Sequence, residues 1–436
     1  MGLLLTVTLV GAESLAIGAV MPEVTAELKD RWLYGWVFSA FALGSLVGIT
    51  FAGYFADRTH PAKPFVVGLG LFCFGLLAGG LAPSMGVLVV ARALQGLGAG
   101  ALPATAYVCI ARAYPVALRS RMFALLATAW LVPGVLGPSI AVVVGRYLGW
   151  RWVFLGLLPL VSVFGVLAAR AVYQRVPPSA PQPAERAVTR DALLLAVGVA
   201  ALLSGITSAQ WTGLVASAVG LAVALPPFLR LTPSGVLMGA PGLAAAIACR
   251  GLLTASFFSV DAFMALALLD GLSAPPWVVG VTLSATTLLW VLGAWVQERL
   301  IDRVGPQRLV RWGFVGMSGL WVIASVAMGA RLPFPIVAVV FGLAGITIGP
   351  AYAALSVTTL SLAEPGAEGR ATAALQLTEV LGIALGTGVT GAIVAYGDRA
   401  SFDVSKALMI AFGLSASWAL LGGVVSRGLP GASRLG

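Results

Sequence analysis

Charged side chains are scarce in this sequence. Only 10% of its 436 residues are Asp, Glu, Lys or Arg, whereas a soluble globular domain carries about 25%. Hydrophobic residues make up 59% of the chain, and the mean hydropathy is +1.00. This composition excludes a soluble domain and predicts an all-α membrane protein, because long apolar runs cross a bilayer as helices.

Residues that support catalysis or disulfide bonding are also few. The chain has one histidine, His60, and three cysteines, Cys73, Cys109 and Cys249, each inside an apolar segment. We expect the cysteines to be small buried residues, with neither disulfides nor a metal site. The sequence has no phosphate-binding Gly-Lys-Ser/Thr loop and no Ser/His/Asp cluster. It therefore predicts no enzyme and no cofactor, and a proton gradient instead of ATP as the source of energy.

The net charge of +10 does not indicate nucleic-acid binding. The basic residues form short clusters between apolar runs, not one basic face. With a cytoplasmic N-terminus, 18 of the 26 Lys and Arg residues fall in inside loops, Arg250 among them, and 7 fall outside. Arg92 is then the sole cation within a span. This bias predicts a multi-pass protein of the inner (plasma) membrane with both termini cytoplasmic.

Fourteen apolar runs are long enough to cross a bilayer. They cover residues 1–22, 34–56, 64–82, 86–113, 121–147, 151–173, 192–207, 211–229, 244–269, 277–297, 312–330, 333–361, 371–397 and 404–426. The runs 192–207 and 211–229 are short, and if they lie in the interface instead, twelve spans remain. The first run lacks a basic start and contains Glu13, so we expect a retained helix and not a signal peptide. Its abrupt apolar start predicts a short basic tail upstream.

A short motif occurs twice. Asp57-Arg58 follows the second span, and Asp302-Arg303 occupies the same place after the hairpin of short runs is set aside. The repeat predicts an N-terminal half at 1–173, a linker with a two-helix insertion at 174–243, and a C-terminal half at 244–436.

Several motifs together resemble the major facilitator superfamily, and within it the fourteen-span drug:proton antiporters. The similar segments are Gly53-x-x-x-Asp57-Arg58, Leu88-x-x-x-Arg92-x-x-Gln95-Gly96-x-Gly98-Ala99-Gly100, Gly137-Pro138, and Glu13 followed nine positions later by Pro22. The resemblance implies the major facilitator fold, with two six-helix halves, and proton antiport. The fifth-span motif departs from the family pattern, since Ala141 and Val142 stand where a glycine pair is expected.

Three acidic residues lie well inside apolar runs: Glu13, Asp261 and Glu379. A charge at this depth costs roughly 2.5–3.5 kcal/mol, so each must face a cavity, form a pair or be protonated. We expect Glu13 to be the proton-coupling carboxylate, with a structural hydrogen bond as the alternative. Asp261 is the expected counterpart of Glu13 in the second half, and Glu379 with Gln376 is expected to contribute to the cavity.

We expect Arg92 to contact backbone carbonyls or an acid of the first span, and the resemblance implies a role in proton transfer or in holding that network. Gln95 is expected to contribute to proton coupling or substrate binding. The alternative for Arg92 is a fixed ion pair between helices. The loop residues Asp57, Arg58, Asp302 and Arg303 are predicted to latch the halves on the cytoplasmic side, or merely to signal orientation.

Small residues predict close helix packing. Gly96 and Gly100 are spaced to bring two helices together, as are Gly44 with Gly48 and Gly382 with Gly386. Gly137-Pro138 is expected to bend the fifth helix.

The sequence thus predicts a secondary transporter that exports small lipophilic or cationic molecules in exchange for protons, by alternating access. A dedicated exporter of one metabolite and a symporter that imports a small solute are the alternatives. A membrane receptor or lipid enzyme would need a sensing domain or catalytic cluster. The expected partners are the substrate, protons and the lipid bilayer, with no nucleic acid, and the expected state is a monomer.

Overall fold

The computed structural model describes residues 2–56, 59–113, 131–176, 186–208, 210–364 and 367–431. This part of the chain is almost entirely helical and contains no strand. It holds thirteen helical segments long and apolar enough to cross a membrane, and a shorter apolar helix at Val132–Leu148. The prediction of an all-α membrane protein is therefore confirmed.

The described part of the N-terminal half consists of helices that follow the predicted runs. They are α1 (Gly2–Leu28), α2 (Tyr34–Ala56), α3 (Ala62–Gly80), α4 (Met85–Ala113), α6 (Leu131–Leu148), α7 (Arg151–Leu155) and α8 (Leu157–Arg175).

The C-terminal half repeats this plan. Its elements are α11 (Leu243–Asp261), α12 (Met264–Leu266), the π-helical turn η3 (Ala267–Gly271), α13 (Pro276–Val304), α14 (Pro306–Gly329), α15 (Phe334–Leu362), α16 (Glu368–Arg399) and α17 (Val404–Val425).

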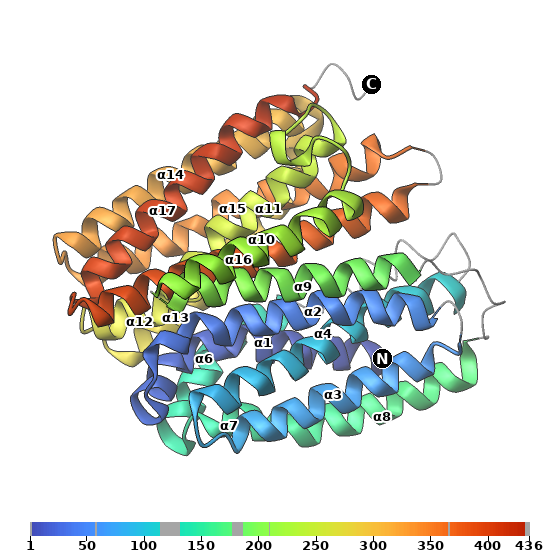
Figure 1. The fold of residues 1–436 in the computed structure, drawn as a ribbon, viewed down its shortest axis with the longest axis horizontal. Coiled ribbons are helices and arrows are strands. Elements are labelled where there is room, and N and C mark those ends of the chain that lie inside the picture. The colour runs from blue at the N-terminus through green and yellow to red at the C-terminus, as the bar shows by residue number, and fades with distance from the viewer. Residues whose placement is uncertain are drawn as a thin grey trace.

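The two halves share one packing pattern. In the first half α2 packs on α4, α3 on α4, and α1 on α6 and α8. In the second half α13 packs on α15, α14 on α15, and α11 on α16 and α17. In Figure 1 the halves lie one above the other, closest at the left and diverging toward the right.

A helical hairpin lies between the halves. It consists of α9 (Arg186–Ser208) and α10 (Trp211–Leu231), so the two short predicted runs are helices of 23 and 21 residues. Figure 1 shows α9 between α2 and α16. Leu195, Val199 and Leu203 of α9 belong to a buried cluster with residues of α2 and α16. The hairpin therefore packs against both halves.

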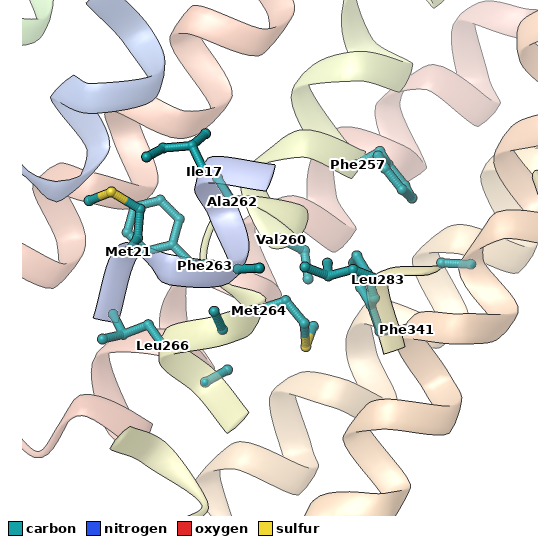
Figure 2. Packing of buried hydrophobic residues seen from close by; sticks show 14 of the residues in the cluster. Ile17, Met21, Phe257, Val260, Ala262, Phe263, Met264, Leu266, Leu283 and Phe341 are labelled. Atoms are coloured by element: carbon teal, nitrogen blue, oxygen red, sulfur yellow. The ribbon is translucent and has the colours of Figure 1, made fainter. Parts of the chain in front are cut away.

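A break in the first span of the second half brings the halves together. Helix α11 ends at Asp261, and the chain continues through Phe263 into α12 and η3. Figure 2 shows Phe263 next to Ile17 and Met21 of α1. The Phe263 ring also lies 4.7 Å from that of Tyr34, and the Tyr34 hydroxyl donates to the carbonyl of Ala262 at 3.2 Å.

Candidate functional site

The first-half cluster consists of Glu13 on α1 with Arg92 and Gln95 on α4. All three side chains are buried, at 0%, 1% and 0% exposure. Arg92 Nη1 forms an ion pair with Glu13 Oε1 and donates to Gln95 Oε1 at 3.0 Å, while Gln95 Nε2 lies 3.4 Å from Glu13 Oε1. The structure therefore brings together three of the residues that the sequence singled out.

Helix geometry explains this cluster. Arg92 and Gln95 are three positions apart on α4 and so share one face of the helix. Arg92 also donates from Nε to the carbonyl of Val37 at 3.3 Å, and its guanidinium lies 4.2 Å from the centre of the Phe41 ring. The first-half cluster thus ties α1, α2 and α4 together through one cation.

One atom in this cluster has no partner. Glu13 Oε2 is buried and accepts no hydrogen bond from the described part of the chain. A buried acceptor without a donor is costly, and protonation would turn this oxygen into a neutral hydroxyl. The geometry is therefore compatible with proton uptake at Glu13 as well as with a fixed ion pair.

The second-half cluster consists of Arg250 on α11, Tyr352 and Ser356 on α15, and Glu379 on α16. Its cation, Arg250, was not expected within a span. Arg250 was assigned to a cytoplasmic loop, which is wrong, because it lies in the third turn of α11 and is 1% exposed. Arg92 is therefore not the sole cation within the spans. The signal was available, since position 250 falls inside the predicted run 244–269.

Arg250 holds the second-half cluster together. Its Nη2 donates to the carbonyl of Tyr352 at 2.9 Å and to the Ser356 hydroxyl. Its guanidinium lies 3.5 Å from the centre of the Tyr352 ring, and its Nη1 is 3.6 Å from Glu379 Oε2. The Tyr352 hydroxyl donates to Glu379 Oε1 at 2.8 Å. Each half thus contains one arginine paired with one carboxylate at membrane depth.

Asp261 and Gln376 join neither cluster. Asp261 is partly exposed at the break after α11, and it forms no hydrogen bond or ion pair with the described residues. Gln376 is partly exposed on α16, one turn before Glu379, and likewise has no hydrogen bond within the described ranges.

The halves meet at the end of the molecule that the charge bias places outside. Arg31 bridges to Asp270 at 2.7 Å and to Asp398 at 3.8 Å. Below this bridge, Ser39 on α2 lies 3.0 Å from Thr387 on α16, measured between the hydroxyl oxygens. On the other side of the interface, the Ser139 hydroxyl of α6 lies 2.9 Å from that of Ser284 on α13. The structure is therefore closed at the predicted outer end.

The predicted cytoplasmic latch is only partly visible. Asp57 and Arg58 lie outside the described residues, as does the side chain of Asp302. Arg303 lies in the last turn of α13.

The glycines of α4 lie where helices touch. A Cβ atom added at Gly96 would sit 2.1 Å from the carbonyl oxygen of Phe41, and one at Gly100 would sit 2.2 Å from that of Ser45. Gly137 and Pro138 lie within α6, which continues through both positions.

Residues 3–387 match the family description Major Facilitator Superfamily. The chain belongs to this superfamily. It is accordingly a multi-pass membrane transporter and not an enzyme, and the predicted resemblance to the family is confirmed.

Relatives of this major facilitator protein include two whose names refer to multidrug efflux or multidrug resistance. A protein of Mycobacterium tuberculosis named as a probable multidrug-efflux transporter is 27% identical over 90% of this chain and 87% of its own length. An uncharacterized MFS-type transporter of the same organism is 31% identical over 48% of this chain and 31% of its own length. Multidrug resistance protein 3 of Bacillus subtilis is 27% identical over 38% of this chain and 33% of its own length. The chain thus spans only about a third of the length of the last two relatives.

Solved structures share the fold. A D-xylose–proton symporter superimposes with a TM-score of 0.71 at 12% identity, over 99% of this chain and 97% of that one. A peptide-transporter-family protein in complex with 5-aminolevulinic acid gives 0.71 at 14% identity, over 98% and 96%. At such identities the likeness shows the fold alone.

Proposed function

We propose that this protein exports small lipophilic or cationic molecules across the plasma membrane in exchange for protons, with both chain ends in the cytoplasm. The observation that carries the proposal is the buried Glu13–Arg92 ion pair with Gln95, a titratable group sealed at membrane depth. The name of the multidrug-efflux relative that aligns with 90% of the chain supports export.

Glu13 is the proposed proton carrier. A proton on Glu13 removes the negative charge that Arg92 faces, and leaves a buried guanidinium with only neutral partners such as Gln95 and the Val37 carbonyl. Because an uncompensated buried charge is costly, protonation would favour a different packing of α1 against α4. Proton binding would in this way bias which side of the transporter is open.

The closed outer end fits one state of this cycle. The halves touch at Arg31, Ser39 and Ser139, all toward the predicted outer side, which corresponds to a form open to the cytoplasm. In the proposed cycle substrate enters this form from the cytoplasm, and an outside proton is exchanged for it after the halves rock.

The proposal is tested in inverted membrane vesicles with an imposed pH gradient. Ethidium and other lipophilic cations should dissipate the gradient when the wild-type protein is present, and should fail to do so with Glu13→Gln at equal expression. An equal response of wild type and variant would assign Glu13 a structural role and move coupling to Asp261 or Glu379. No response of wild type to a broad panel of compounds would exclude multidrug export.

A further inference from the structure

We propose that the cationic group of a transported molecule binds at Glu379, beside the partly exposed rings of Phe258, Trp290 and Tyr352, and competes there with Arg250. This inference rests on the proposed function, which it deepens by assigning a site and a class of substrate: planar monovalent organic cations. The proton would then bind at the Glu13–Arg92 pair, on Glu13, and the substrate at the Glu379–Arg250 pair, on Glu379.

The carboxylates of the two buried pairs differ in how exposed they are. The Glu13 side chain is 0% exposed, whereas that of Glu379 is 24% exposed. A carboxylate that faced hydrocarbon at this depth would be costly, so its exposed part belongs to the space between the helices. Only the carboxylate of the second-half cluster is therefore reachable by a ligand in this conformation.

Glu379 is also held less firmly than Glu13. Its Oε2 lies 3.6 Å from Arg250 Nη1, which is too far for a hydrogen bond, and among the described residues only Oε1 accepts one, from Tyr352. On the arginine side, Nε and Nη1 are buried without a hydrogen-bond partner in the described part of the chain. Each member of the pair thus keeps capacity for another partner.

A row of aromatic side chains leads to this carboxylate. The ring of Phe258 on α11 lies 6.3 Å from that of Trp290 on α13, which lies 5.3 Å from that of Tyr352 on α15. All three side chains are partly exposed. Cations bind to the faces of such rings, and Arg250 already does so at 3.5 Å from the Tyr352 centroid.

The charges of the pair predict the electrical balance of exchange. Arg250 and ionised Glu379 together are neutral, and one monovalent cation bound at the carboxylate adds a single positive charge. Exchange of one such cation for one proton carried by Glu13 is electroneutral, whereas exchange of a divalent organic cation for one proton moves net charge. Neutral lipophilic molecules would use the rings alone.

Binding of ethidium to the purified protein in detergent, measured by fluorescence anisotropy, tests the site. We expect Glu379→Gln to weaken binding at least about tenfold, because the carboxylate charge that attracts the cation is lost. The matched control is Asp403→Asn, which changes an exposed carboxylate at the outer end that pairs with Arg331. If Glu379→Gln does not fold, Glu379→Asp keeps the charge and should retain weaker binding.

The contribution of Trp290 in the aromatic row can be tested against a control position on the same helix, α13. Trp290→Leu should weaken ethidium binding about tenfold, whereas Trp295→Leu, at a 63% exposed position of α13, should leave it unchanged. In competition, 1-naphthylmethylamine should displace ethidium and 1-naphthoate should not.

The inference is overturned if Glu379→Gln binds ethidium as tightly as wild type, or if 1-naphthoate displaces ethidium and the amine does not. The second result would assign an anion site to Arg250 instead. If ethidium moves protons in vesicles while Glu379→Gln binds normally, the proposed function stands and this site assignment fails alone.

Discussion

At the scale of single residues, the transporter keeps its buried charges in pairs. Arg92 is 1% exposed and has Glu13 as its counter-ion, so removal of either partner leaves a charge at membrane depth with no opposite charge beside it. Loss of one member of a buried pair costs about 3–5 kcal/mol, whereas loss of both is often close to neutral.

We therefore expect Arg92→Gln to destabilise the protein more than the double variant Glu13→Gln/Arg92→Gln. The measurement is the temperature at which half of the detergent-solubilised protein is no longer monodisperse. A double variant less stable than Arg92→Gln would show that the pair contributes more than mutual charge compensation.

Single residues also show what the sequence could predict. Glu13 and Arg92 were identified because each is a lone charge in an apolar run, and a family motif surrounds each. Arg250 was missed because charge counting assigned it to a loop, although the span continues around it. Pairing of Arg250 with Glu379 across α11 and α16 depends on tertiary contacts, which no local pattern encodes.

At the scale of helices, close backbone approach is repeated in the two halves. An added Cβ at Gly345 on α15 would lie 2.1 Å from the carbonyl oxygen of Thr286, as one at Gly96 would from that of Phe41. Thr286 and Phe41 are separated by 245 positions, the same interval that separates Asp302 from Asp57. The glycine spacing in α4 was predicted to bring helices together, whereas the same spacing in α15, at Gly345 and Gly349, was not recognised.

This geometry predicts a sharp difference between two glycines of α15. Gly345→Ala should reduce the yield of monodisperse protein severalfold, since α15 must move away from α13 to admit the methyl group. Gly342→Ala, one turn earlier, has no neighbouring atom within 4 Å of the added Cβ and should behave like wild type. Equal yields of the two variants on size-exclusion chromatography would contradict the proposed close packing.

At the scale of the whole molecule, the fold was predictable from the sequence. The conformational state, which is closed at the predicted outer end, was not. Long apolar runs predicted the helices of both halves and of the hairpin, because apolar length indicates which segments can cross a bilayer. The same runs contain no information on which end is closed. That depends on contacts between distant segments, such as Arg31 with Asp270 and Ser39 with Thr387.

Alternating access predicts that these outer contacts must separate during transport. In a background in which Cys73, Cys109 and Cys249 are replaced, Ser39→Cys/Thr387→Cys should form a disulfide, because the native hydroxyl oxygens are 3.0 Å apart. Oxidation should stop ethidium transport in vesicles, and a reductant should restore it. Each single variant is the control, and full activity of the cross-linked protein would exclude an opening at this interface.

Exchange of substrate for protons can be measured with purified protein in liposomes. With an acidic lumen and ethidium outside, antiport predicts ethidium uptake together with a rise in lumenal pH, reported by a trapped dye. Reversal of the pH gradient should reverse the direction of ethidium movement, and Glu13→Gln should remove the dependence on the gradient. Ethidium uptake that does not depend on the pH gradient, or that is fastest when protons and ethidium move in the same direction, would contradict antiport.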